Sequence, residues 1–284
     1  MTRLMRGRFI WSGTLLLLAS FAACILTGMK NAQSAPIIRR ADVKLPQLAA
    51  ETPPVRIALL SDIHLGNRGM EPDRLAKIVD QVNAAHPDLV LLAGDFVIGE
   101  DVTGAEARAK ALTEPLSRLR AKQGVFAVLG NHDHWTAPEA IQAALVKAGI
   151  TVLENEAERR GAFAVIGVGD RFSGHDNIAR SLASARRVGG TPIVFTHSPD
   201  ISPDMSSGIP LVLAGHTHCG QMVLPVVGPV IRYSHFQHLY NPRYRCGLVR
   251  DADRLTVVTG GVGSGGLPFR LGAMPDWWLL TVRP

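Results

Sequence analysis

The sequence predicts an α/β fold in one large domain, and three observations support this. Its 284 residues are 46% hydrophobic and 19% charged, which provides enough apolar surface for a core and excludes a disordered chain. From Val55 onward, short apolar runs alternate with amphipathic stretches. The C-terminal part is richer in strand-like runs, which favours two packed sheets with helices outside them.

The first 30 residues are predicted to form an apolar helix that acts as a signal anchor or a signal peptide. Arg3, Arg6 and Arg8 precede a stretch without charge from Phe9 to Met29, which is long enough to span a bilayer. A cleaved signal peptide and a lipid-modified Cys24 are alternatives. Because a short basic N-terminus usually stays in the cytoplasm, we expect a single-pass protein of the cytoplasmic membrane with an extracytoplasmic domain, or a cleaved secreted form.

Residues 31–54 are predicted to be a linker, and residues 55–284 to be the folded domain. The linker holds four prolines among mixed polar residues. Seven of the 30 Lys and Arg residues lie before Val55, against two of the 24 acidic residues, so the formal charge of +6 resides almost entirely in the leader and linker. The nearly neutral domain offers no basic groove for phosphate contacts, which argues against a nucleic-acid partner.

The expected elements of the domain follow the apolar pattern in chain order. Strands are predicted at residues 55–61, 88–93, 125–129, 150–153, 163–168, 192–195, 210–214, 255–259 and 277–282. Helices are predicted around residues 75–82, 107–119, 138–148 and 177–187. The repeated order of strand and helix is typical of an α/β domain.

Polar residues follow five of these strands at the point where each strand ends. They are Ser61-Asp62-Ile63-His64, Gly94-Asp95, Gly130-Asn131-His132-Asp133, Thr196-His197 and Gly215-His216-Thr217-His218. Since ligands of open α/β sheets bind beyond the carboxyl ends of the strands, we expect Asp, Asn and His side chains to gather at one edge. In Asp62-x-His64 and His216-x-His218, the alternation of an extended chain would direct both side chains the same way, so that each pair could hold one metal.

This set of oxygen and nitrogen ligands is typical of a manganese, iron or zinc site, and it lacks the thiolate cluster of a structural zinc site. Either histidine pair alone would more often belong to a turn or a surface. However, five of the ten histidines fall at strand ends, in motifs that also contain Gly, Ser or Thr. Their joint occurrence predicts a metal centre.

In this order, the motifs resemble those of the calcineurin-like metallophosphoesterases. The resemblance covers the domain from Val55 and implies a two-sheet β-sandwich flanked by helices. His134-Trp135, Gly220-Gln221 and the stretch 263–270 resemble the bacterial, membrane-associated branch of this family, which commonly carries an N-terminal targeting segment.

Carried over position by position, the resemblance implies two divalent metal ions. Asp62, His64 and His218 would hold the first ion, Asn131, His197 and His216 the second, and Asp95 would bridge both. His132 would be the catalytic histidine, and Asp133 would orient its ring.

These assignments imply a metal-dependent phosphoester hydrolase, either a phosphodiesterase or a pyrophosphatase. A bridging water activated to hydroxide would attack phosphorus in line, and His132 would contact the phosphate or protonate the leaving oxygen. The substrate could be lipid-linked, and the candidates to contact it are Arg232, Tyr233, Arg243, Arg245, Ser264 and Arg270. The alternative class is a non-catalytic, metal-stabilised binding module of the cell envelope.

Cys219 stands where this branch usually has Gly. It is interpreted either as an inert small side chain or as a redox-sensitive thiol near the metals. Because Cys246 is the only other cysteine of the domain, an exported protein could form one disulfide between them.

Overall fold

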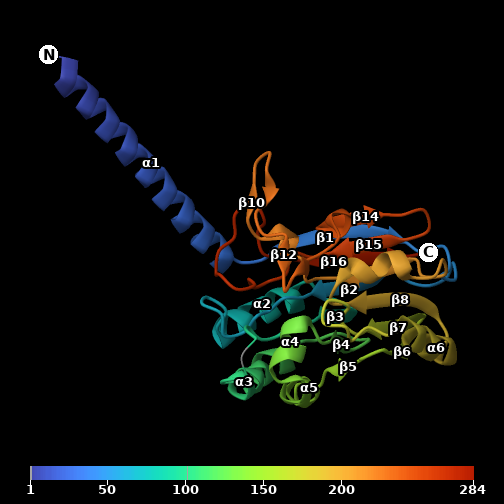
Figure 1. The fold of residues 1–284 in the computed structure, drawn as a ribbon. Coiled ribbons are helices and arrows are strands. Elements are labelled where there is room, and N and C mark those ends of the chain that lie inside the picture. Colours follow the sequence, from blue (N-terminus) through green and yellow to red (C-terminus); the bar gives the residue numbers. More distant parts are fainter. Residues whose placement is uncertain (1, 101) are drawn as a thin grey trace.

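Two six-stranded sheets stack face to face, and helices cover their outer faces (Figure 1). The computed structural model describes residues 2–100 and 102–284, and the side chains of residue 14 and of residues 18–100 and 102–284. The two sheets with outer helices confirm the predicted α/β fold.

The first sheet has the strand order β1-β16-β2-β3-β4-β5. Its strands are β1 (Ile37–Lys44), β2 (Val55–Leu60), β3 (Leu89–Ala93), β4 (Val125–Val128), β5 (Thr151–Val152) and β16 (Asp276–Arg283). The strands from β2 to β5 run parallel, whereas β16 is antiparallel to β2 and parallel to β1. The last strand of the chain therefore lies between the first two.

The second sheet has the order β14-β15-β9-β8-β7-β6. Its strands are β6 (Glu156–Arg160), β7 (Phe163–Val168), β8 (Thr191–Thr196), β9 (Leu211–Ala214), β14 (Gly247–Arg250) and β15 (Leu255–Val258). Its four central strands run parallel, and the outer two are antiparallel. Two short hairpins stand outside both sheets and consist of β10 (Val223–Leu224) with β11 (Gly228–Pro229), and β12 (Tyr233–Ser234) with β13 (Gln237–His238).

The core has three layers of apolar contacts. Phe126 of the first sheet and Phe163 and Phe195 of the second pack between the sheets. The outer face of the first sheet packs on α2 (Pro72–Ala84), α3 (Ala105–Ser117) and α5 (Pro138–Lys147). The outer face of the second sheet packs on α6 (Ile178–Val188) and the 3-10 helix η1 (Pro199–Asp204). Short helices occur at α4 (Asn131–Thr136), η2 (His218–Gly220) and η3 (Pro242–Tyr244).

Three strands of the two six-stranded sheets were missed by the apolar pattern, and all three lie at sheet edges. Among the predicted linker residues 31–54, residues 37–44 form β1, which pairs with β16 along its whole length. The strands β6 and β14 form the two edges of the second sheet. Edge strands bury less of their surface and tolerate charged residues, as Arg159 and Arg160 in β6 illustrate. The interpretation of residues 31–54 as a simple linker is therefore corrected, because residues 37–44 belong to the first sheet.

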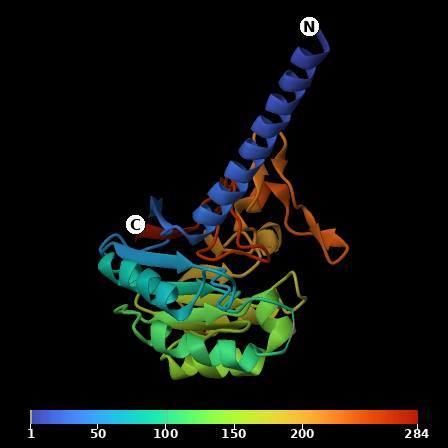
Figure 2. The same ribbon diagram turned by 90° about the vertical axis from the view of Figure 1, so that its left-hand side faces the viewer.

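The N-terminal helix α1 extends over Thr2–Gln33 and leaves the body on one side (Figures 1 and 2). Among the described residues, no helix is long and apolar enough to cross a membrane. The side chains of Arg3, Arg6 and Arg8 and of residues 15–17, on which the anchor prediction partly depends, lie outside the described residues.

The C-terminal end of α1 is attached to the body. The Arg270 backbone N–H donates to the Gly28 carbonyl at 2.9 Å, and the Asn31 side chain donates to the Arg270 carbonyl at 3.2 Å. A Cβ atom at position 28 would come within 2.2 Å of the Phe269 ring. Gly28 is therefore required for the helix to approach this loop.

Candidate metal centre

The five polar strand ends meet at one end of the two sheets. The strands β2, β3 and β4 deliver Asp62, Asp95 and Asn131, and β8 and β9 deliver His197 and His216. Immediately after the strands, the backbone leaves the extended conformation, with φ of 53° at Asp62, 57° at Asp95 and 69° at His216. The prediction that alternation in an extended chain aligns Asp62 with His64, and His216 with His218, was therefore wrong. Left-handed turns place these side chains instead.

The first group of side chains consists of Asp62, His64 and His218, whose ligand atoms all lie within 4.8 Å of one another. Nε2 of His64 lies 3.1 Å from Nε2 of His218, and the latter lies 3.4 Å from Oδ1 of Asp62. This carboxylate oxygen is buried and has no hydrogen-bond partner among the described residues. A buried, unpartnered carboxylate oxygen facing two imidazole nitrogens fits a divalent cation.

The second group consists of Asn131, His197 and His216. Nε2 of His197 lies 3.1 Å from Oδ1 of Asn131 and 3.2 Å from Nδ1 of His216. The other ring nitrogen of His197 contacts the Ala93 carbonyl at 2.7 Å, and that of His216 contacts the Leu239 carbonyl at 2.7 Å. Such carbonyl contacts fix the tautomer and orientation of a metal-binding imidazole.

Asp95 lies between the two groups. Its Oδ2 atom is 3.6 Å from Nε2 of His64 and 3.3 Å from Nε2 of His197. The preceding Gly94 has φ of 80°, and a Cβ there would meet the Gly130 backbone nitrogen at 2.6 Å. The Gly-Asp pair is thus explained by close approach of the β3 and β4 ends, which places the carboxylate between the two groups.

Burial and mutual charge control ionisation in this cluster. Burial lowers the pKa of His64 to about 3 and that of His216 to about 4, which keeps both rings neutral and able to act as ligands. Burial raises the pKa of Asp62 to about 6. Although burial opposes it, the pKa of His197 lies well above its ordinary value because Asp95 attracts the ring proton. The carboxylates therefore favour a positive charge between them.

His132 and Asp133 do not act on each other as predicted. The Asp133 carboxylate accepts backbone N–H groups of Asp95 at 2.9 Å, Phe96 at 2.8 Å and Gly130 at 2.9 Å. The His132 ring instead contacts the Gly99 carbonyl through Nδ1 at 2.6 Å. The correction follows from the start of α4, where the Asp133 carboxylate accepts the free Gly130 N–H of its own helix and also the N–H groups of Asp95 and Phe96, which follow β3.

A pocket of about 270 Å³ opens beside the two groups. Its walls include Asp95, Asn131, His132, His216 and His218, and none of its described lining residues is Lys or Arg.

Two aromatic side chains that were not assigned to the site from the sequence, Trp135 and Phe172, also line this pocket. The Trp135 ring lies 5.6 Å from the His132 ring and 6.0 Å from the Phe172 ring, and Phe172 lies 4.7 Å from His216. Phe172 belongs to the loop after β7, where no motif marks it. A planar or apolar group attached to a bound phosphate would contact this wall.

The remaining candidate contacts divide between the pocket and the protein interior. Tyr233 lines the pocket, whereas Arg270 is fully buried behind His218. Its guanidinium donates to the Gly260 carbonyl at 2.6 Å and to the Gly263 carbonyl, and it lies 3.1 Å from Nδ1 of His218. Arg243 pairs with Asp251 at 2.6 Å on the surface. Arg270 is therefore a structural residue rather than a substrate contact.

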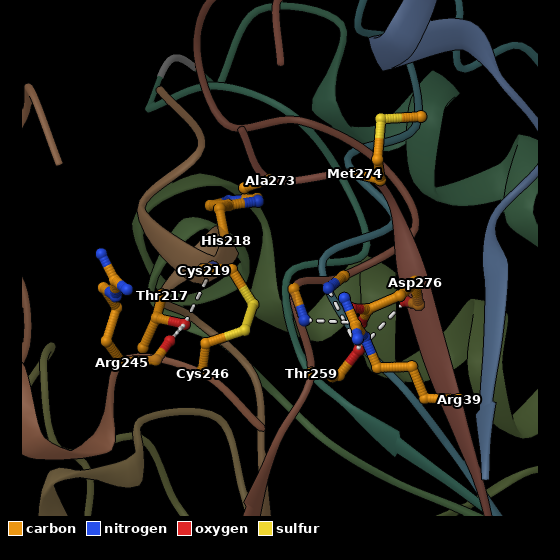
Figure 3. Close-up of a disulfide and its surroundings, with 12 residues drawn as sticks. Arg39, Thr217, His218, Cys219, Arg245, Cys246, Thr259, Ala273, Met274 and Asp276 are labelled. Atoms are coloured by element: carbon orange, nitrogen blue, oxygen red, sulfur yellow. Dashed lines mark hydrogen bonds and ion pairs between the residues drawn. A yellow bond between two sulfur atoms is a disulfide. The ribbon is translucent and has the colours of Figure 1, made fainter. Parts of the chain in front are cut away.

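Cys219, immediately after His218, forms a disulfide with Cys246 (Figure 3). The bond joins the η2 turn to the start of β14, and the Thr217 hydroxyl donates to the Arg245 carbonyl beside it at 2.6 Å. Both earlier interpretations of Cys219, an inert side chain and a free thiol, are therefore replaced by the disulfide that the cysteine count allowed. Cys24 is a free cysteine.

Together, the two stacked sheets and the clustered carboxylate, amide and imidazole groups define a metal-binding site of a hydrolase fold. Residues 55–220 match the calcineurin-like phosphoesterase family, to which the chain belongs. It is 32% identical over 241 residues to phosphodiesterase YaeI of Escherichia coli (strain K12), covering 81% of this chain and 82% of that protein. An uncharacterized metallophosphoesterase of Aquifex aeolicus is 31% identical, with 81% and 85% covered.

Longer relatives also match. A transmembrane protein with metallophosphoesterase domain from Danio rerio is 29% identical over 285 residues, with 93% of this chain and 61% of that protein covered. The chain spans between about half and two thirds of the length of the first three curated relatives, at 61%, 52% and 66%.

Proposed function

We propose that the protein is a phosphodiesterase that binds two divalent metal ions. The observation that carries the proposal is the position of Asp95, whose Oδ2 atom lies within 3.6 Å of an imidazole nitrogen from each of the two ligand groups. Asp62, His64 and His218 would hold one ion, Asn131, His197 and His216 the other, and Asp95 both. The mixture of carboxylate, amide and imidazole ligands suits manganese, iron or zinc.

When bound, the metals would supply Lewis-acid stabilisation of the phosphoryl oxygens and would lower the pKa of the attacking water. The residues of the chain position the other reacting groups. Because the Gly99 carbonyl accepts the proton on Nδ1 of His132, Nε2 remains to contact the phosphate or to protonate the leaving oxygen. Asp133 holds the Asp95 backbone in place through its N–H group.

The walls of the pocket favour a diester over a monoester. A phosphate monoester carries up to two negative charges at neutral pH, and beyond the proposed metal ions the described lining residues provide no Lys or Arg to balance them. A diester carries one negative charge and a second organic substituent. Trp135 and Phe172 offer an apolar surface for that substituent. The name of the Escherichia coli relative is in accord with this choice.

We place the catalytic domain outside the cytoplasm, attached to a membrane through α1. The Cys219–Cys246 disulfide supports this proposal because disulfides persist in oxidising compartments. Two relatives are named as transmembrane proteins with a metallophosphoesterase domain. The orientation is tested with two reporters fused to the C-terminus, one active only outside the cytoplasm and one active only inside it. We expect activity of the first, and activity of the second would contradict the proposed orientation.

The activity is tested with bis-p-nitrophenyl phosphate as a soluble diester. We expect hydrolysis that manganese stimulates and that a chelator abolishes. The variant Asp95→Asn should lose at least about 100-fold in rate, since loss of a bridging ligand weakens binding of both metals. The matched variant Asp80→Asn alters an exposed carboxylate on α2 and should keep full activity. Full activity of Asp95→Asn, or full activity in excess chelator, would exclude the proposed mechanism.

A further inference from the structure

The β10–β11 and β12–β13 hairpins carry an unusual concentration of exposed apolar side chains. We call this surface the apolar rim, and its exposed residues are Leu224, Val226, Val227, Val230, Ile231, Tyr233 and Phe236. Ile231 and Tyr233 also line the pocket beside the metal centre. A contiguous exposed apolar surface of this kind marks an interaction site, and here it borders the entrance to the pocket.

The two hairpin tips hold apolar residues where turn chemistry favours others. Val226 has φ of 68°, with the Val227 N–H donating to the Pro225 carbonyl, so a β-branched residue occupies the strained centre of a γ-turn. His235 and Phe236 have φ of 50° and 62° in a two-residue turn that usually contains Asn-Gly. The side chains of Val226 and Phe236 are fully exposed. Because backbone strain and exposed apolar side chains both cost stability, their combination at the two tips indicates that these residues serve a function rather than the stability of the fold.

The base of the first hairpin and the end of α1 attach to the same segment of chain. The Arg270 N–H donates to the Gly28 carbonyl of α1, and the next N–H, of Leu271, donates to the Gln221 carbonyl before β10. The Val223 N–H in turn donates to the Leu271 carbonyl at 2.7 Å. Figures 1 and 2 show that α1 and the β10–β11 hairpin leave the body on the same side. A surface that receives α1 would therefore also meet this hairpin.

The charge of this region matches an anionic surface. Residues 221–250 contain four arginines and neither Asp nor Glu. Arg232 lies between the two hairpins and donates to the Val227 and Pro229 carbonyls at 2.8 and 3.0 Å. Three acidic residues from elsewhere contact the region. Glu100 pairs with His235 at 3.2 Å, Asp251 pairs with Arg243, and Asp200 accepts the Asn241 N–H at 2.9 Å. Basic and apolar residues side by side are typical of surfaces that insert into the headgroup layer of a bilayer.

We propose that the apolar rim inserts into the surface of an anionic lipid bilayer beside α1 and places the mouth of the pocket at the headgroups. Diesters embedded in the bilayer then reach the metal centre without leaving the lipid. The membrane contact stands independently of the proposed reaction, whereas this consequence for the substrate rests on it.

The test uses the full chain, reconstituted into vesicles of phosphatidylethanolamine and phosphatidylglycerol. In a Cys24→Ser background without reductant, Val227→Cys is labelled with an environment-sensitive fluorophore and compared with Val146→Cys. Both valines are similarly exposed, at 61% and 58%, but Val146 lies on α5, away from the rim. We expect blue-shifted emission and quenching by brominated lipid at position 227 and neither effect at position 146.

Two outcomes would overturn the proposal. The first is a label at position 227 that stays as solvent-exposed as the label at position 146. The second is a shift at position 227 that also occurs in lipid-free detergent and grows with protein concentration, which would assign the rim to contact with a second copy of the chain. Hydrolysis of the soluble diester is measured on the same samples, so a failure of the membrane contact and a failure of the proposed activity remain distinguishable.

The lipid consequence has its own measurement. The variant Val227→Asp should bind vesicles less deeply and should lose about tenfold in turnover of a vesicle-embedded diester, on the scale of one buried valine side chain. Its hydrolysis of bis-p-nitrophenyl phosphate should be unchanged, because residue 227 does not line the pocket. Equal turnover of the embedded diester by Val227→Asp and Val146→Asp would refute this consequence.

Discussion

Replacement of the buried Arg270 by alanine should destabilise the protein and loosen its metal centre. The guanidinium is fully buried, and burial lowers its pKa to about 10. It donates to the Gly260 and Gly263 carbonyls, which lie on the loop between β15 and β16. Removing the guanidinium leaves both carbonyls buried without this hydrogen-bond donor, and each such loss costs about 1–3 kcal/mol of folding free energy. We therefore expect Arg270→Ala to lower the free energy of unfolding by about 4 kcal/mol.

Thermal unfolding measures this effect. For a domain of this size, about 4 kcal/mol corresponds to a decrease in Tm of roughly 8–16 °C. The matched control is Arg118→Ala, which removes an exposed ion pair with Asp80 and should cost about 0.5 kcal/mol. Because Arg270 also lies against Nδ1 of His218, manganese affinity of the Arg270 variant should fall by about 10-fold or more. A Tm within about 2 °C of the control would refute this account of the loop.

Three further predictions follow from the same contacts. Reduction of the Cys219–Cys246 bond, which closes a loop of 27 residues, should lower stability by about 3.5 kcal/mol, and a Tm independent of dithiothreitol would contradict this. Gly28→Val should detach α1 from the body and expose it to limited proteolysis. A second change, Phe269→Ala, should restore protection, and a failure to do so would mean that the Phe269 ring is not what excludes a side chain at position 28. Burial raises the pKa of Asp62 to about 6, so below that pH a metal must displace its proton as well as the ring proton of His197, whose pKa is also raised. Manganese affinity measured by calorimetry should therefore fall by at least about tenfold per pH unit, and a flat profile between pH 5 and 6 would be inconsistent with this.

The sequence predicted the central strands better than the edges, for a physical reason. A strand with neighbours on both sides and sheets or helices on both faces must be apolar throughout, as Leu89–Ala93 is, and such a run is visible in the sequence. The segments Ile37–Lys44 and Glu156–Arg160 lie at edges and carry charges that a buried strand would exclude. Their pairing depends on partners far along the chain, which no local pattern records.

The candidate site shows the same division. Its seven proposed metal ligands follow strand ends, so the topology of parallel strands was enough to bring them together. The role of Asp133 was missed because it depends on the Gly130 N–H at the start of α4 and on the Asp95 N–H after β3, rather than on the adjacent His132. Phe172 was missed because it reaches the pocket from a loop without a motif. Contacts made across the two sheets require the three-dimensional fold.

The position of β16 between β1 and β2 has a consequence for biosynthesis. Until residues 276–283 leave the ribosome, β1 has no hydrogen-bonding neighbour, and one side of β2 remains open. The two adjacent residues Trp277 and Trp278 contribute to opposite faces of the first sheet. Until they are synthesised, each face therefore lacks one of its largest core side chains. The nascent domain therefore completes its first sheet only after synthesis of residues 276–283. Loss of residues 276–284 would leave β1 without its described neighbour, and such an unpaired strand is a target for quality-control proteases and for aggregation.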